Sequence, residues 1–158
     1  MKKKYLSLLL LGFLLIGITT TITSCSDKDD EITYLISLNE LPIDAQTFLN
    51  DYFPTVKAST VEKQSIGKVV MYKVNLDSGF EILFNSEGVW QEIEAPQGKS
   101  IPTGIVPQEI EEYVAKQYPD YGINEVNKTG NGYNVEINGG VRLTFNAAGE
   151  CTGTFEDL

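Results

Sequence analysis

The chain has 158 residues, of which 22 are acidic and 12 are basic, so its formal net charge at neutral pH is −10. This negative charge repels nucleic-acid phosphates and anionic lipid headgroups, which excludes nucleic acid as a partner and excludes membrane adhesion through a basic patch. The chain contains no histidine and no glycine-rich phosphate-binding motif, so the usual nucleophilic schemes are absent. We therefore expect no enzymatic activity and no cofactor.

The first 24 residues have the layout of a secretory signal peptide. Three lysines precede an apolar run that begins at Tyr5, and no charged residue follows before Cys25. The segment Ile22–Cys25 resembles a bacterial lipobox, in which the cysteine is acylated and becomes the new N-terminus. We therefore predict that residues 1–24 are removed and that lipid on Cys25 anchors the protein; the alternative is a chance cysteine near an ordinary cleavage site.

Residues 25–40 are expected to form an acidic tether, because the segment after Cys25 is too hydrophilic to be buried. Its Lys28, Asp29 and Asp30 resemble the signal that sends lipoproteins to the outer cell surface in one group of Gram-negative bacteria; the alternative is a plain solvated spacer. Residues 32–38 are apolar enough for a short edge strand. With Cys25 acylated, Cys151 has no partner for an intrachain disulfide.

Two segments of the chain repeat the same pattern. Residues 41–54 align without gaps with residues 106–119, and two later blocks of the first copy, 72–76 and 84–88, recur 61 positions further on. We therefore predict a repeat at residues 41–95, a linker at 96–105 and a second repeat at 106–158.

Each repeat is predicted to contain one helix followed by three or four strands. Apolar residues at Ala45, Phe48, Leu49 and Tyr52 follow helical spacing after a proline, and the Pro at position 54 ends the helix. Beyond each helix, every second residue is apolar in several short segments, and glycine-containing turns separate these segments. This pattern is typical of an antiparallel meander. The predicted fold class is α+β.

The ordered motifs resemble a known family. A helix ending in Phe-Pro or Tyr-Pro, a strand of the form Tyr-x-Val-x-Leu or Ile, and a Phe-Asn-x-x-Gly turn are similar to the PepSY-like, β-lactamase-inhibitor-like proteins of the periplasm. The resemblance spans residues 41–157. It implies two helix-plus-sheet units joined into one curved sheet, with the helices on one face and the other face open, and it implies no enzymatic activity.

The open face is the expected binding surface. If Tyr72, Val74, Ile82 and Phe84 face the helices, their neighbours on the same strands face outward. We expect a protein or peptide partner to bind these outward residues, together with residues of the last strands: Met71, Lys73, Glu81, Leu83, Trp90, Glu92, Asn134, Glu136, Arg142 and Thr144. For Trp90, two alternatives remain open, namely exposure on this face or packing under the neighbouring unit.

The sequence thus predicts a non-catalytic cell-envelope lipoprotein that binds a protein partner, with regulation of an exported hydrolase as the most concrete version. The expected location is the outer membrane of a Gram-negative bacterium, surface-exposed or facing the periplasm. An alternative is a glycan- or calcium-binding module, although the tether acids Asp27, Asp29, Asp30 and Glu31 lack the spacing of an EF-hand loop. No metal site is predicted.

Overall fold

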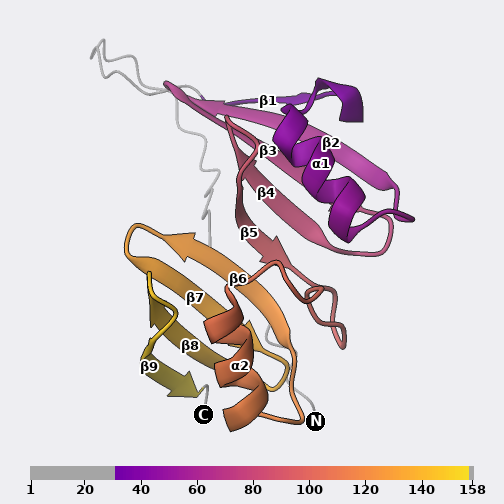
Figure 1. Cartoon of the computed structure of the whole chain (residues 1–158). Helices are drawn as coiled ribbons and strands as arrows, with labels where there is room; N and C mark the ends of the chain where they lie inside the picture. Colours follow the sequence, from indigo (N-terminus) through magenta and orange to yellow (C-terminus); the bar gives the residue numbers. More distant parts are fainter. Residues whose placement is uncertain (1–30, 157–158) are drawn as a thin grey trace, which may run out of the picture.

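The computed structural model describes residues 31–156. Its nine strands form a single antiparallel sheet in which each strand pairs with the next one along the chain. The two α-helices lie on the same face of this sheet (Figure 1). The elements are β1 (Glu31–Leu35), the 3-10 helix η1 (Leu38–Glu40), α1 (Ile43–Tyr52), β2 (Ala58–Ile66), β3 (Val69–Leu76), β4 (Glu81–Asn85), β5 (Trp90–Glu94), α2 (Gln108–Gln117), β6 (Ile123–Thr129), β7 (Gly132–Ile137), β8 (Val141–Asn146) and β9 (Cys151–Glu156).

The two helices begin and end as the prolines predict. Pro42 and Pro107 are the N-cap residues, directly before the first helical residue, and their missing N–H groups leave no donor unsatisfied. Phe53 and Tyr118 leave helical geometry, with φ near −132° and −133°, because each precedes a proline. Neither helix within residues 31–156 is long and apolar enough to cross a membrane.

Strand β1 occupies part of the segment that we expected to be a tether. It pairs antiparallel with β2, with Leu35 opposite Glu62, so the tether does not extend through residues 31–35. The edge strand that we expected at 32–38 is shorter than predicted. Tyr34 and Leu35 are 56% and 75% exposed, so backbone hydrogen bonds hold β1 more than side-chain burial does. Cys25, Lys28, Asp29 and Asp30 lie outside the described residues.

The core lies between the helices and one face of the sheet. One row of side chains crosses six neighbouring strands, and each member is at most 2% exposed: Val74, Ile82, Ile93, Val126, Val135 and Leu143. Fully burying such a side chain contributes about 1.5–3 kcal/mol. Both helices pack on this face, since Phe48 of α1 meets Phe84 edge-on at 5.6 Å and Tyr113 of α2 meets Phe145 at 5.4 Å.

The order of one helix and four strands occurs twice, as α1 with β2–β5 and as α2 with β6–β9. The irregularities of the sheet recur as well. The pairing of β4 with β5 slips between Leu83 and Phe84, and that of β8 with β9 slips between Thr144 and Phe145. The sheet is therefore bent at matching places in its two halves.

The halves meet where β5 pairs with β6, through Glu92 and Asn127, Ile93 and Val126, and Glu94 and Glu125. The segment 96–105, predicted as a linker, packs closely against this junction. Its Ile101 and Ile105 are buried. The Ile101 N–H donates a hydrogen bond to a carbonyl of β6 at 2.7 Å. The two halves consequently share one hydrophobic core.

Candidate functional site

The sheet face opposite the helices carries most of the residues that we predicted as a binding surface. Lys73, Leu83 and Glu92 lie directly opposite one another on β3, β4 and β5. Their strand neighbours Val74 and Ile82 are buried under the helices, which confirms the predicted alternation on β3 and β4. We call this surface the open face and define it by the outward residues of β3–β8: Met71, Lys73, Asn75, Glu81, Leu83, Glu92, Glu94, Glu125, Asn127, Asn134, Glu136, Arg142 and Thr144.

A row of four glutamates crosses the middle of the open face. Glu81 lies opposite Glu94, Glu94 opposite Glu125, and Glu125 opposite Glu136, so the row runs over β4, β5, β6 and β7 and spans the junction of the halves. Directly opposite side chains on paired strands are roughly 5 Å apart at Cβ, and like charges in this arrangement destabilise a sheet. Of these four, Glu125 and Glu94 were not among the binding residues that we predicted.

In the part of the chain that the structure describes, the glutamate row forms ion pairs with cations only at its two ends. Lys73 Nζ lies 2.6 Å from Glu81 Oε2, and Arg142 Nε lies 3.1 Å from Glu136 Oε2. In the middle, Asn127 donates a hydrogen bond from Nδ2 to Glu125 Oε1 at 2.8 Å. Within residues 31–156, neither Glu94 nor Glu125 forms an ion pair. The negative charge of the open face is therefore concentrated at the junction of the halves.

The environment of these groups changes their proton affinity. Burial raises the pKa of Glu92, and the neighbouring Glu125 and Glu81 raise it further, while Lys73 opposes them. Burial and the same glutamates also raise the pKa of Glu94. The hydrogen bond with Glu81 raises the pKa of the Lys73 ammonium. The ionised carboxylates at the junction are thus less favourable in the folded protein than in water.

Trp90 is not on the open face, and the expectation that it joins Glu92 there is wrong. It pairs with Phe84 on the helix side and is 8% exposed. The cause is the bulge in β5: Leu83 pairs with Glu92 and Phe84 with Trp90, which leaves Gln91 as an extra residue between them. Residues two apart on this strand therefore face opposite sides. The alternative, packing under the neighbouring unit, is the one that the structure supports.

The surroundings of Trp90 come from the second half. Lys128 Nζ lies 3.8 Å from the centre of the Trp90 ring, and the Tyr133 ring lies 6.4 Å away. Sequence reasoning missed both residues. The repeat could have revealed them, because Lys63 stands opposite Tyr72 in the first half as Lys128 stands opposite Tyr133 in the second.

Within the described residues, no group of three or more histidine, cysteine, aspartate or glutamate side chains could hold a metal ion. The carboxylates of the glutamate row thus do not form such a group within residues 31–156.

Comparison with known proteins identifies the family. The family model described as "Putative beta-lactamase-inhibitor-like, PepSY-like" matches residues 30–87 and 70–152, which together cover most of the chain. The chain belongs to this PepSY-like family. No curated protein matches it. The family resemblance drawn from the repeated motifs is thereby confirmed.

Solved structures share the fold of this PepSY-like protein. A "putative periplasmic protein" of the DUF2874 family from Bacteroides vulgatus is 25% identical and superposes with a TM-score of 0.74, over 84% of this chain and 100% of that one. A "putative calcium-regulated periplasmic protein" from Bacteroides thetaiotaomicron is 23% identical, with a TM-score of 0.75 over 78% and 97% of the chains. A second Bacteroides vulgatus protein, described as periplasmic and of unknown function, is 24% identical, with a TM-score of 0.73 over 80% and 100%. These neighbours support a location in the cell envelope.

Proposed function

We propose that this PepSY-like protein is a non-catalytic envelope protein whose open face binds an extended, positively charged segment of a protein partner. The observation that carries the proposal is the row Glu81, Glu94, Glu125 and Glu136, which forms ion pairs only at its two ends within residues 31–156. Lysine or arginine side chains of a bound segment would neutralise its central carboxylates, and opposite charges across an interface give both specificity and rapid association.

The shape of the open face suits an extended segment. The side-by-side strands make a broad surface, and an extended peptide lying on it turns every second side chain toward the sheet. The half-buried side chains of Met71 and Leu83 lie beside Lys73 and Glu92, so apolar contact is available next to the charges. Flexible methionine side chains are common on surfaces that adapt to a partner.

The row of like charges also costs stability, which supports a role in binding. Each directly opposed pair of like charges is destabilising, by up to about 1 kcal/mol. Features that lower stability without a structural gain are frequently found at functional surfaces. A partner's cations would remove this cost on binding.

A synthetic peptide with alternating lysine and valine residues tests the proposal. NMR titration at low salt should shift the amide signals of Leu83, Asn127 and Asn134, and affinity should fall as salt is added because the contacts are charged. The double variant Glu94→Gln/Glu125→Gln should bind at least about tenfold more weakly, since it removes the two central charges.

The matched control is Asp44→Asn/Asp51→Asn, which removes the same charge from α1 on the other side of the sheet. This variant should bind the peptide as well as the wild type does. Equal loss in the two double variants would reduce the effect to overall charge and contradict the proposal. So would signal shifts confined to the helix side.

We further propose that lipid on Cys25 anchors the protein to the outer membrane, with Lys28, Asp29 and Asp30 directing it to the cell surface. The support is the lipobox-like segment and the periplasmic description of the structural neighbours. Mass spectrometry of the native protein should find an acylated N-terminal cysteine. An unmodified Cys25 behind an intact Met1 would overturn this part.

The partner that we propose is an exported hydrolase whose activity this protein regulates. The family description "beta-lactamase-inhibitor-like" supports this choice. The two halves are, in this proposal, copies of one ancestral unit that together build the surface. The calcium and glycan alternatives predict a different result: calcium or an envelope glycan would raise the melting temperature at low salt while the lysine-containing peptide would not.

A further inference from the structure

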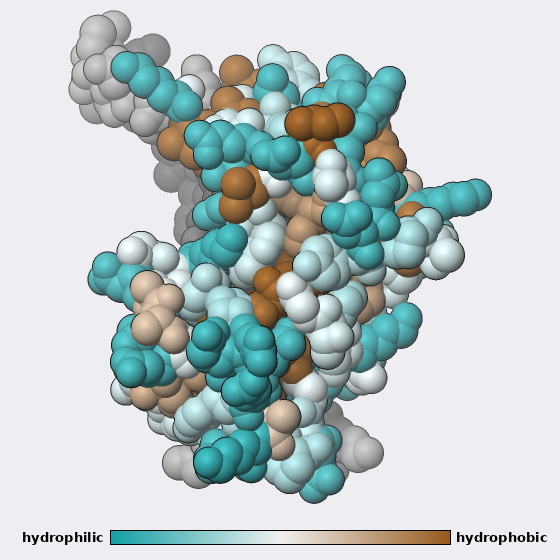
Figure 2. Space-filling model, in the orientation of Figure 1, coloured by the Kyte–Doolittle hydropathy of each residue, from teal (hydrophilic) through white to brown (hydrophobic). Residues whose placement is uncertain are grey.

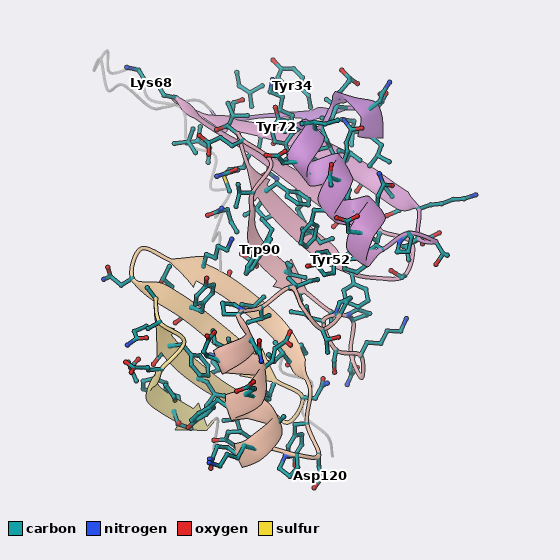
Figure 3. The ribbon with its side chains drawn as sticks, viewed as in Figure 1. Tyr34, Tyr52, Lys68, Tyr72, Trp90 and Asp120 are labelled. Atoms are coloured by element: carbon teal, nitrogen blue, oxygen red, sulfur yellow. The ribbon has the colours of Figure 1, made fainter. Side chains whose placement is uncertain are left out.

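A cleft of about 530 Å³ opens on the helix side of the sheet, at the junction of the halves. Its lining combines β5, β6 and β7 with the end of the linker and the start of α2. Figure 3 shows Trp90 between the two halves on this side, away from the open face. In Figure 2, which views the same side, apolar residues are exposed in the middle between more hydrophilic surroundings. The lining residues are Trp90, residues 104–108, Glu111, Lys128 and Tyr133.

Lys128 is the unusual residue of this cleft. Burial lowers the pKa of its ammonium, and no carboxylate within residues 31–156 forms an ion pair with it. Its neighbour is the Trp90 ring, and the ammonium nitrogen lies 3.8 Å from the ring centre. The ring stabilises the cation, but it cannot accept all three ammonium hydrogens as strong hydrogen bonds. The Lys128 ammonium therefore keeps hydrogens that an anion in the cleft could accept.

The other walls of the cleft combine apolar and polar groups. Ile105, Val106 and Pro107 form one side, and the half-buried Tyr133 ring forms another. These groups offer contact to a compact apolar body, while the Lys128 ammonium offers a charged hydrogen bond beside it.

Two further groups limit the charge of the ligand. The first turn of α2, at Gln108, faces the cleft with no side chain capping it, and the helix dipole there favours negative charge. Glu111 also lines the cleft, and its Oε1 accepts a hydrogen bond from the Gly104 N–H at 2.7 Å. This carboxylate disfavours a doubly charged anion such as phosphate more than a singly charged one.

We propose that this cleft binds a small carboxylate carried on a compact apolar group. The carboxylate lies next to Lys128, and the apolar group contacts Tyr133 and residues 105–107. The cleft lies on the opposite side of the sheet from the open face, so it is a second site, and it does not depend on the function proposed above.

Trp90 is the single tryptophan of the chain, so its fluorescence reports this cleft directly. N-acetyl-phenylalanine is the probe, and its carboxamide is the matched control, because the two differ only in the charged group. A ligand of this size with ordinary efficiency binds with a Kd of about 1 mM. The acid should change the fluorescence saturably, and the amide should bind at least about tenfold more weakly, since it lacks the charged hydrogen bond.

The variant Lys128→Met keeps an unbranched side chain, shorter by the terminal nitrogen, and removes its charge; it should weaken binding of the acid about tenfold. The variant Lys63→Met changes the equivalent lysine of the first half, which lies over Tyr72, and should leave binding unchanged. NMR shifts of the Gly104 amide provide a readout that does not depend on the altered surroundings of the indole.

Three results would overturn the proposal: equal affinity for the acid and the amide, no saturable response to the acid up to about 10 mM, or equal weakening in Lys63→Met. The comparison of acid and amide uses the wild-type protein, so it decides the matter even if Lys128→Met fails to fold.

Discussion

Glu92 shows how one residue can be well placed for a surface and costly for the fold. It lies between Leu83 of β4 and Asn127 of β6, half-buried, with Glu125 and Glu81 close by. Lys73 is the cation that acts on it, and the attraction is smaller than the combined effect of burial and the glutamates, because the net shift of the Glu92 pKa is upward. The folded protein therefore binds a proton at Glu92 more tightly than the unfolded chain does.

We predict that Glu92→Gln raises the free energy of unfolding at pH 7. A carboxyl group whose pKa is raised by folding costs stability above that pKa, and the cost disappears as the pH falls to the ordinary value near 4.5. The gain of the variant should therefore be largest near neutral pH and should vanish near pH 4. Urea denaturation of wild type and variant across this pH range measures it.

The control for this experiment is Glu87→Gln, which removes a carboxylate from the exposed turn between β4 and β5. Because this position is exposed, the substitution should change the free energy of unfolding by no more than about 0.5 kcal/mol. A Glu92→Gln variant that is less stable at pH 7 would show that Lys73 outweighs burial and like-charge repulsion.

Residue identity alone could predict part of the candidate site. The alternation of apolar residues along the strands correctly assigned four residues to the open face, because the pairing of β3 and β4 is regular there: Met71, Lys73, Glu81 and Leu83. The same alternation predicted the wrong face for Trp90, because the extra residue Gln91 places Trp90 and Glu92 on opposite faces of the sheet. The glutamate row depends on which strands pair and in which register, so residue types alone could not predict it.

At the scale of elements, the turns between strands determine how each helix sits on the sheet. The turn after β4 contacts the start of α1 at Gly88, and the turn after β8 contacts the start of α2 at Gly149. Asn85 closes the first turn by accepting hydrogen bonds at Oδ1 from the N–H groups of Glu87 and Val89. Asn146 does the same in the second half. The Phe-Asn-x-x-Gly motif thus has a structural explanation in both halves.

We predict that Gly88→Ala destabilises the protein strongly. Gly88 has φ of +88°, and a Cβ there would lie 2.8 Å from the Ala45 nitrogen and 2.9 Å from Pro42 Cβ. Backbone atoms of α1 cannot move aside without shifting the helix. We expect the free energy of unfolding to fall by about 2–4 kcal/mol, from left-handed strain and overpacking together, as measured by urea denaturation.

The matched control is Gly98→Ala. Gly98 has a similar φ of +79°, but a Cβ there would meet no atom within 4 Å. This variant should lose about 1–2 kcal/mol from strain alone. Equal losses in the two variants would mean that the contact of the turn with α1 contributes nothing.

The elements themselves were largely predictable, and the bulges were not. Prolines and aromatic residues mark the ends of α1 and α2, and the alternation of apolar residues marks β3 and β4. A bulge depends on how two strands twist against each other, and a single strand shows no sign of it. It recurs at matching places, between Leu83 and Phe84 and between Thr144 and Phe145.

At the scale of the whole molecule, the linker joins the halves instead of separating them. Its Ile101 and Ile105 are buried in the same core as residues of both halves. The Tyr52 hydroxyl at the end of α1 donates a hydrogen bond to the Gly104 carbonyl at 2.8 Å, which fixes the linker to the first half. The linker bounds predicted from the sequence, 96–105, follow from where the repeated pattern stops and starts again. Such bounds do not show whether the residues between two repeats pack into the core.

We predict that the two halves unfold together, and that Ile93→Ala shifts this transition without splitting it. Ile93 is fully buried on β5, opposite Val126 of β6, so it belongs to the junction. Truncating a buried isoleucine to alanine costs about 2–5 kcal/mol. Because the core is shared, this loss should lower the midpoint of the whole molecule. Trp90 fluorescence, which reports the junction, and far-ultraviolet circular dichroism, which reports all strands, should give coincident curves in wild type and variant. Fluorescence that changes first, followed by a second dichroism transition in one half, would instead show that three residue pairs between β5 and β6 and a buried linker are too few to couple the halves.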